Sequence, residues 1–371
     1  MDGKLEDIFT MWSFEGDFIH HSALNVAVGL GELMKGRDGA QCSFCGLVGD
    51  DEFGAFLRRR LASAGVRDRT QTSATSTGSC IILSGSHDRG FVTCVGATGL
   101  LSTAHLAHIE ESASEGLAKR LHVHISGYFS CHALQAGLGG HLRSLRAIAA
   151  GRGQHITISF DTNCDATGKW GSGVLDVLAE VDIFLPNELE AQAIADTMPA
   201  VNESGANRAA SAMQETNANV SSTNGELMEA ADGLATTREG PAAPASQPPH
   251  RLASAANRLS CVVREAVVVT CGKDGCIVQT REAVIKGEPP RRFGAPSDIV
   301  AVDATGAGDA FDAAFIFRWA VCGGSLEDGV RAGSCCGALC TETIGANANL
   351  PSATTLAQME HLYQLDTSQI A

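Results

Sequence analysis

Hydrophobic residues recur along this chain at two spacings, which alternate from one segment to the next. In segment 22–34 the apolar side chains fall three or four positions apart, a period that predicts an amphipathic helix. Segments 42–49 and 156–160 are short apolar runs instead, and such runs predict buried strands. Further strands are predicted at 121–126, 183–185, 266–270 and 276–280, and further helices at 53–61, 133–149, 174–180, 188–195, 252–263, 307–320 and 326–341.

Strands that alternate with helices in this way predict an α/β fold with a doubly wound, mostly parallel sheet and helices on both of its faces. One region interrupts the alternation. Two β-type runs, at 79–83 and 90–95, flank a polar stretch and predict a hairpin.

The composition changes between residues 197 and 250, where Ala, Ser, Asn, Thr and Pro dominate. A segment with so few large apolar side chains cannot bury enough surface to offset the entropy lost on ordering it. We therefore expect a low-complexity, largely disordered insertion, with at most a short helix at 226–234, inside one domain that spans residues 1–371.

Charge and cysteine content narrow the class of protein. Lys and Arg together number 27 and Asp and Glu 42, and the net charge of −15 argues against nucleic acid or an anionic membrane as the main partner. The 13 cysteines are scattered without zinc-ligand spacing, so we expect reduced thiols and a cytoplasmic protein. Acidic residues interrupt the first twenty positions and no apolar run reaches membrane-spanning length, so we expect neither a signal peptide nor a membrane span.

The glycine-rich run 302–311 at the start of a predicted helix carries the clearest chemical signal. Gly306 and Gly308 let backbone N–H groups approach an anion closely, and the helix start adds partial positive charge. Asp309 falls in the first helical turn, where a carboxylate is electrostatically favoured and could accept a proton from a hydroxyl group. Taken alone, the same residues also fit an ordinary glycine-rich turn capped by an Asp.

The order Asp303-Ala304-Thr305-Gly306-Ala307-Gly308-Asp309 resembles the signature of the ribokinase-like (PfkB) carbohydrate kinase family. Segments 46–54, 187–190 and 270–275 resemble further motifs of that family, in the family's order. Alone, segment 187–190 would be a helix cap with a surface Glu, and 270–275 a hairpin turn. The resemblance covers the chain except the first twenty residues and the insertion. It implies a ribokinase-like fold whose β-hairpin, at about 72–98 with part of 10–22, forms a small lid.

The resemblance also implies an ATP-dependent kinase that uses Mg²⁺, with K⁺ as a second candidate cation, and phosphorylates a hydroxyl group of a small sugar or sugar-like substrate. Asp309 would be the catalytic base, beside Gly306, Ala307 and Gly308. The other implied roles are nucleotide binding by Asn187, Glu190, Thr270, Gly272, Gly275, Gly345 and Asn349, substrate binding by Asn25 and Asp161, indirect magnesium binding by Glu190 and monovalent-cation binding by Asp303. Lid hairpins in this family can pair between subunits, so a homodimer through the lid is a further expectation.

Two features depart from the family's pattern. Residues 1–14 do not resemble the hydrophobic strand with which members usually begin, and His20-His21 replaces the Gly-Gly pair expected before Asn25. Both departures affect the substrate side more than the phosphate chemistry. A shortened N-terminus, a changed substrate and an inactive but folded homologue each account for them. The alternative functions are a nucleoside kinase on the same fold and a non-catalytic sugar- or nucleotide-binding protein.

Overall fold

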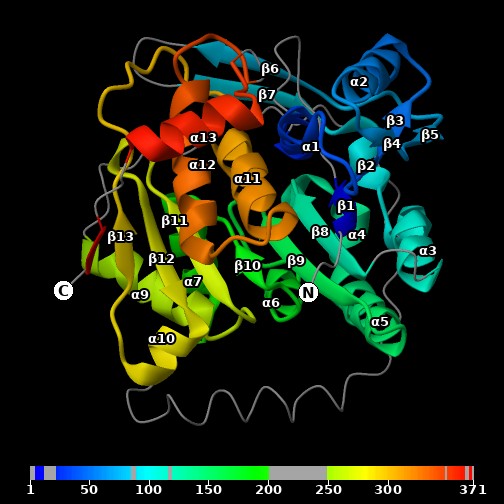
Figure 1. Ribbon diagram of the computed structural model, residues 1–371. Coiled ribbons are helices and arrows are strands. Elements are labelled where there is room, and N and C mark those ends of the chain that lie inside the picture. The colour runs from blue at the N-terminus through cyan, green and yellow to red at the C-terminus, as the bar shows by residue number, and fades with distance from the viewer. Residues whose placement is uncertain are drawn as a thin grey trace.

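A ten-stranded sheet forms the centre of the molecule (Figure 1). The computed structural model describes residues 5–11, 22–84, 89–115, 119–199, 249–346, 349–363 and 367–369. Along the sheet the strand order is β14-β13-β12-β11-β10-β9-β8-β1-β2-β4, parallel from β11 to β4 and antiparallel from β11 to β14. The strands are β1 Leu5–Met11, β2 Cys42–Cys45, β4 Arg67–Asp68, β8 Arg120–Ser126, β9 His155–Asp161, β10 Ile183–Phe184, β11 Ala266–Thr270, β12 Cys276–Thr280, β13 Arg291–Phe293 and β14 Thr367–Gln369.

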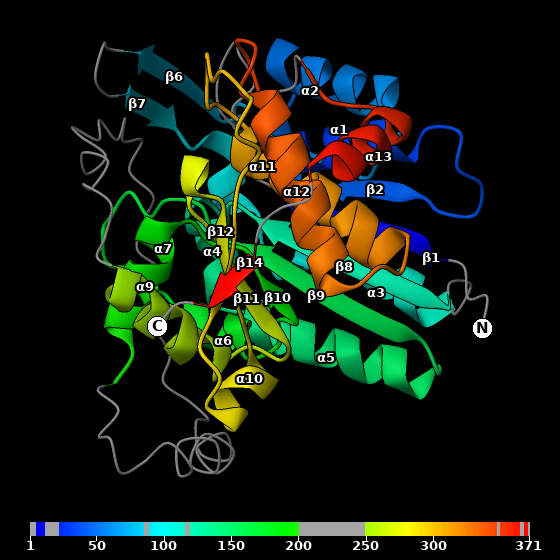
Figure 2. The same cartoon turned by 60° about the vertical axis from the view of Figure 1, so that its left-hand side comes forward.

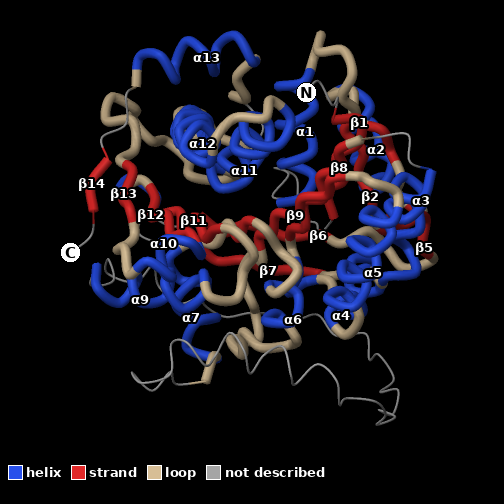
Figure 3. The backbone as a smooth tube through the Cα atoms, turned by 60° about the horizontal axis from the view of Figure 1, so that its bottom comes forward, coloured by secondary structure: helices blue, strands red, loops and turns tan. Residues whose placement is uncertain are grey.

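Helices cover both faces of this sheet (Figure 3). One layer contains α1 Ser22–Met34, α11 Ala307–Ile316, α12 Leu326–Cys340 and α13 Ala353–Leu362. The opposite layer contains α5 Leu138–Gly151, α6 Val174–Leu178, α7 Glu188–Thr197, α9 Pro249–Ser260 and α10 Arg281–Lys286. The predicted doubly wound α/β fold is confirmed.

Each face of the sheet has its own hydrophobic core, because successive strand residues point to opposite faces. In β11, Ala266 and Val268 belong to the cluster under α1 and α11, whereas Val267 and Val269 belong to the cluster on the other face. A strand buried on both faces reads as a continuous apolar run, which is the pattern that the sequence shows here.

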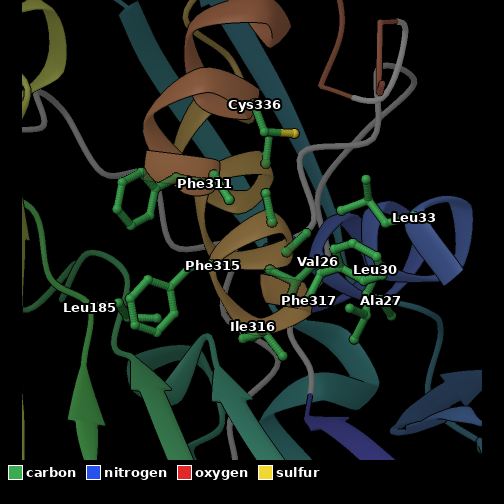
Figure 4. Close-up of a cluster of buried hydrophobic side chains, with 14 of the residues drawn as sticks. Val26, Ala27, Leu30, Leu33, Leu185, Phe311, Phe315, Ile316, Phe317 and Cys336 are labelled. Carbon is green, nitrogen blue, oxygen red and sulfur yellow. The ribbon is translucent and has the colours of Figure 1, made fainter. Parts of the chain in front are cut away.

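Helices α1 and α11 contribute many of the side chains in the hydrophobic core on their face of the sheet (Figure 4). Val26 and Leu30 of α1 lie beside Phe317, just after α11, whereas Phe311 and Phe315 point to the other side of α11 and stack with their ring centroids 6.2 Å apart. Helix α12 approaches α11 closely at Gly333, where a Cβ atom would lie 2.9 Å from the Phe311 ring. These contacts hold the first turn of α11, and therefore Asp309, against α1.

Two small sheets lie outside the large one. Strands β6 Ser79–Ser84 and β7 Arg89–Cys94 form the predicted antiparallel hairpin, which projects from the body of the molecule (Figure 2). Strands β3 Leu47–Gly49 and β5 Gln71–Ser73 pair in parallel. The prediction of one strand over 42–49 was therefore wrong: the chain breaks at Gly46 because β2 pairs in the large sheet and β3 in the small one.

The expectation that residues 1–14 contain no hydrophobic strand was also wrong. Strand β1 pairs in parallel with both β8 and β2, in the interior of the large sheet. Glu6 and Asp7 interrupt its apolar pattern, and a register shift between Leu5 and Asp7 falls at the same place. This strand forms because it pairs with a neighbour on each side, and the order of hydrophobic residues along the sequence does not reveal such pairing. His20 and His21 lie outside the described residues.

Several smaller elements differ from the prediction. The helix predicted at 133–149 is divided into α4 His132–Gln135 and α5, and the helix predicted at 307–320 passes from α11 into a π-helical turn at Phe317–Val321. The sequence interpretation missed α3 Ala107–Glu115, α10, β13 and α13. Between α7 and α9, residues 200–248 of the predicted insertion, with its short helix at 226–234, lie outside the described residues. Helix α2 Glu52–Ser63 confirms the helix predicted at 53–61.

No helix in the described ranges is long and apolar enough to cross a membrane. Nine of the thirteen cysteines lie buried in the fold: Cys42, Cys45, Cys80, Cys131, Cys271, Cys276, Cys335, Cys336 and Cys340. They pack as small apolar side chains, in agreement with the expectation of reduced thiols.

Candidate active site

Polar side chains gather at the carboxyl-terminal edge of the parallel strands. β8 ends at Ser126, β9 at Asp161 and β11 at Thr270, and Asn187 follows β10. In open α/β sheets this edge is where ligands bind, because loops and helix N-termini converge there. The start of α11 meets the same edge.

Asp309 lies in the first turn of α11 with only 6% of its surface exposed. The amide of Asn25, on α1, donates a hydrogen bond to it, with 2.7 Å between Asn25 Nδ2 and Asp309 Oδ2. The structure thus brings together a predicted substrate-binding residue and the predicted catalytic base. This contact depends on the packing of α1 against α11.

The glycines before Asp309 have different structural roles. Gly306 caps α11 with a left-handed φ of 75°, and a Cβ atom there would lie 2.4 Å from the Cβ of Ala346. Gly308, by contrast, faces open space, with no atom within 4 Å of the position of a Cβ. Gly306 is therefore required by backbone conformation and packing. Gly308 leaves the helix N-terminus accessible. The backbone N–H of the neighbouring Ala307 donates to Ala304 O at 3.3 Å.

Asp161 is the centre of a buried hydrogen-bonded group. Asn163 donates to it twice, from its backbone N to Oδ1 at 3.1 Å and from Nδ2 to Oδ2 at 2.9 Å. The hydroxyl groups of Ser22 and Ser126 contact each other and lie 3.4 and 3.5 Å from Asp161 Oδ2. Asn163 adopts a left-handed φ of 53°, which is uncommon outside glycine and marks a constrained turn.

Four buried carboxyl groups lie near one another here: Asp161, Glu190, Asp309 and Asp312, each between 2% and 7% exposed. Burial, followed by the charge of Asp309, raises the pKa of Asp161 to about 7. Burial and the charge of Asp161 raise the pKa of Glu190 to about 8. Burial also raises the pKa of Asp312 well above its ordinary value, with Asp161 and Asp309 adding to the effect. Like charges in a dry site disfavour one another, so Asp161, Glu190 and Asp312 hold their protons to higher pH than ordinary carboxyl groups do.

Asn187 and Glu190 form a capping box at the start of α7. Glu190 N donates to Asn187 Oδ1 at 3.0 Å, and Asn187 N donates to Glu190 Oε2 at 2.9 Å. The helix-cap interpretation is therefore right for Asn187, but Glu190 is buried and is not a surface residue. Asn187 also forms an isolated parallel bridge with Thr270, and Thr270 N donates to Pro186 O at 2.9 Å. Two predicted nucleotide-binding segments are thus adjacent.

The turn between β11 and β12 contains Gly272 and Gly275. Both have a left-handed φ, of 52° and 85°. A Cβ atom at Gly275 would lie 1.9 Å from Phe293 O, whereas one at Gly272 would meet nothing within 4 Å. Packing against β13 explains Gly275. The open surface at Gly272 is compatible with a bound ligand.

Asp303 joins the segment before α11 to the loop after α12. Its Oδ1 accepts a hydrogen bond from Thr305 N at 3.0 Å, and its Oδ2 accepts one from Gly345 N at 3.1 Å. Asn349, a few residues later, donates from Nδ2 to Leu339 O at 3.2 Å. The structure thus places Gly345 beside Asp303 and orients Asn349 toward the end of α12. Residues 347 and 348 lie outside the described part of the chain.

The sequence interpretation missed the buried polar side chains beneath Asp309. Thr157 Oγ1 lies 2.8 Å from His122 Nδ1, His122 Nε2 lies 2.9 Å from Ser159 Oγ, and Ser159 Oγ lies 2.8 Å from His124 Nδ1. His124 Nε2 then faces Asp312 Oδ2 at 3.8 Å. We call these four residues with Asp312 the buried polar chain. The spacing of two between the histidines and between the hydroxyl residues is a signal that could have been read as one face of two neighbouring strands.

Both histidines of the buried polar chain are neutral. Burial lowers the pKa of His124 to about 3, and burial together with His124 lowers that of His122. Neutral imidazole rings donate through one nitrogen and accept through the other, as the hydrogen bonds from Thr157 to His124 require. The last step, from His124 Nε2 to Asp312 Oδ2, is too long at 3.8 Å for a hydrogen bond. Within the described ranges, no three His, Cys, Asp or Glu side chains are grouped so that they could hold a metal ion by themselves.

Comparisons with known proteins agree with this geometry. An uncharacterized sugar kinase of Archaeoglobus fulgidus is 36% identical over 89 residues, which are 24% of this chain. The chain thus spans about a third of the length of the curated relative it matches, 32%.

Among solved structures, a ribokinase II from E. coli in complex with ATP and Mg²⁺ is similar, with a TM-score of 0.64, 20% identity, and coverage of 97% of this chain and 100% of that one. An adenosine kinase from Sinorhizobium meliloti has a TM-score of 0.64 at 18% identity, with coverage of 95% and 99%. These likenesses show the ribokinase-like fold.

The profile of the family described as pfkB family carbohydrate kinase matches residues 22–227 and 225–353. The match includes α1 with Asn25, the end of β9 with Asp161, and the start of α11 with Asp309. This chain belongs to the pfkB family of carbohydrate kinases.

Proposed function

We propose that this protein transfers a phosphoryl group from ATP to a hydroxyl group of a small sugar or sugar-like substrate, with Asp309 as the catalytic base. The observation that carries this proposal is the position of Asp309. It lies at the N-terminus of α11, hydrogen-bonded to Asn25 on one side and next to the open surface of Gly308 on the other. A carboxylate, a side-chain amide and the N-terminus of a helix thus lie together, which suits proton removal and phosphoryl transfer.

The residues of the chain divide the work as follows. Asn25 and Asp161 bind hydroxyl groups of the substrate, and Asp309 takes the proton of the reacting hydroxyl. The amides at Ala307 and Gly308 stabilise negative charge on the transferred group. ATP supplies the phosphoryl group when it is bound along Thr270, Gly272 and Gly275.

The site fits Mg²⁺ held mainly by phosphate oxygens and water. Mg²⁺ is commonly bound by one or two carboxylates together with substrate phosphates. Glu190 contributes its buried carboxyl group next to Asn187, which is the chemistry that an indirect, water-mediated contact needs. For K⁺, Asp303 supplies a carboxylate beside the Gly345 loop. Both assignments rest on the proposed kinase function.

Replacing Asp309 with Asn tests the proposal directly. We expect Asp309→Asn to lose at least about a hundredfold in kcat, because general base catalysis contributes about 10²- to 10⁴-fold. The affinity for ATP, measured by calorimetry, should change little. The matched control is Asp298→Asn, since Asp298 is an exposed Asp outside the site. Full activity of Asp309→Asn would exclude Asp309 as the base.

The substrate class is tested by measuring ATP consumption with free sugars and with adenosine in parallel. Turnover with a sugar supports the proposal, whereas turnover with adenosine alone would identify a nucleoside kinase. Thermal stabilisation by a sugar without turnover would identify a non-catalytic binding protein.

The β6–β7 hairpin is proposed to close over the substrate as a lid, together with part of residues 10–22. Pairing of two such hairpins would form a homodimer. Sedimentation equilibrium on the intact protein and on a chain lacking residues 80–93 tests this, and a monomer in both cases would exclude the dimer.

A further inference from the structure

A cavity of about 390 Å³ opens at the amino-terminal edge of the parallel strands, opposite the edge that carries Asp309. Its walls include the beginnings of β8 and β9, with Arg120, His155 and Thr157, as well as Arg146, Arg264 and Trp319 from the adjoining segments. Its volume falls within the range of about 300–1,000 Å³ that is typical of small-molecule sites. None of the residues proposed for catalysis contributes to it.

Positive charge exceeds negative charge in this cavity, although the chain as a whole carries −15. Three arginines face two acids, Asp182 and Glu265. Asp182 binds two arginines at once, Arg146 Nη2 at 2.6 Å and Arg264 Nε at 3.2 Å. Arg146 has a second carboxylate nearby, Glu180, with 3.9 Å between Arg146 Nε and Glu180 Oε2. Burial and the nearby Asp182 raise the pKa of Glu265, which favours its neutral form.

Arg120 has no carboxylate partner among the described residues. Its Nη2 donates to Ala320 O at 3.2 Å, a contact that holds the guanidinium group in place without neutralising it. A guanidinium presents several N–H donors in one plane, which matches the oxygen atoms of a phosphate or a carboxylate. The guanidinium group of Arg120 is thus held in place while its positive charge is not neutralised by a carboxylate, and such a group can bind an oxyanion.

The remaining walls suit the rest of a small organic molecule. Trp319 packs its ring edge-to-face against His122, with 5.7 Å between centroids, and lines the cavity. Thr157 also lines it and hydrogen-bonds to the same histidine. A ligand in contact with Thr157 therefore touches the outer end of the buried polar chain, whose inner end is Asp312, one turn after Asp309 in α11.

We propose that this cavity is a binding site for a small metabolite with an oxyanion group, either a phosphate monoester or a carboxylate. Arg120 and Arg264 bind the oxyanion, and Trp319 packs against the carbon skeleton. The site is separate from the phosphoryl-transfer site, so its occupation does not depend on the proposed kinase activity.

Tryptophan fluorescence reports on this site because Trp319 lines it. The full chain is titrated at constant ionic strength with glycerol 3-phosphate and, separately, with succinate. We expect a saturable change with at least one of the two probes, and the responding probe distinguishes the phosphate monoester from the carboxylate. The signal should disappear in Trp319→Phe.

Arg120→Gln should weaken the apparent affinity at least tenfold. The matched control is Arg59→Gln, because Arg59 is an exposed arginine on α2, far from the cavity in sequence and in the fold. Arg264→Gln gives an independent second variant, and circular dichroism checks that each variant is folded. The proposal is overturned if the wild type shows no saturable change with either probe, or if folded Arg120→Gln and Arg264→Gln bind as tightly as Arg59→Gln.

Discussion

Asn25 and Asp309 are 284 positions apart in the sequence, yet their side chains form a hydrogen bond of 2.7 Å. Both were identified from motifs, but the bond between them follows from the packing of α1 against α11. Asp312, Ser126 and His124 were not identified: no motif marks Asp312 or Ser126, and the alternate spacing of His122 and His124 indicates a shared strand face but not a site. They take part in the site through burial and proximity alone, which appear only when β8, β9 and α11 are assembled.

Asn25→Ala tests the first of these contacts. A hydrogen bond to a charged group contributes about 1.5–3 kcal/mol, so its loss should lower kcat/KM by about ten- to hundredfold. Asn257→Ala is the matched control, since Asn257 also uses its side chain in a hydrogen bond, to Gln279 at 2.8 Å, but lies on α9 away from the site. Equal activity of the two variants would contradict the role of Asn25.

The raised pKa of Asp161 predicts a pH dependence of stability. The pKa rises from 3.8 to about 7 on folding, so the folded state binds more protons than the unfolded state between these values. The stabilisation is therefore fully present below pH 3.8 and is lost as the pH rises through about 7. In Asp161→Asn this contribution is absent. Thermal melts between pH 5 and about 8 should show a smaller decline of Tm for this variant than for the wild type, and parallel declines would refute the assignment.

At the scale of single elements, the structure at the start of α11 depends on the local glycine-rich sequence and on packing against another segment of the chain. The glycine-rich sequence predicted a turn before a helix, and the structure has one. Which glycine is needed for the fold depends on a neighbour from another segment, Ala346, which approaches Gly306 and not Gly308. The sequence contains no sign of this difference.

Gly306→Ala and Gly308→Ala should therefore affect different properties, the first the stability of the fold and the second the activity. Gly306→Ala introduces a side chain at a left-handed φ of 75° and a contact of 2.4 Å, so we expect it to lower the free energy of unfolding by at least about 1–2 kcal/mol. Gly308→Ala meets open space and should leave stability nearly unchanged. If the transferred phosphoryl group binds at Gly308 as proposed, the added methyl group should lower kcat. Urea unfolding and turnover of both variants decide this, and equal stability losses would argue against the distinction.

At the scale of the whole molecule, alternation of strand and helix predicted the α/β class and the two covered faces of the sheet. The order of strands and the place of β1 could not be predicted, because pairing partners are far apart in sequence. The two helices that flank the segment predicted as an insertion, α7 and α9, pack against each other. Arg258 of α9 donates to Met198 O at 3.0 Å and to Pro199 O at 3.1 Å, at the end of α7.

Replacing residues 200–248 with a short Gly-Ser linker should for this reason leave the domain folded. Because α7 and α9 already pack against each other, the linker only has to run from Pro199 back along α9 to its start at Pro249, about 14 Å of helix before Arg258. Unfolding in urea should remain cooperative with nearly the same midpoint. A broad transition, or loss of the folded state, would show that the segment belongs to the domain.

The amino-acid sequence by itself determined the fold class, the family and the identity of Asp309, Asn187 and Glu190, because these depend on local periodicity and on short ordered motifs. The cytoplasmic location and the roles of the site residues stay predictions. Only the tertiary structure decided that Asp309 receives a hydrogen bond from Asn25, that Glu190 is buried, that β1 lies inside the sheet and that Arg120 lacks a carboxylate partner among the described residues. Each of these depends on distances between segments remote in sequence, and burial and electrostatics are set by such distances.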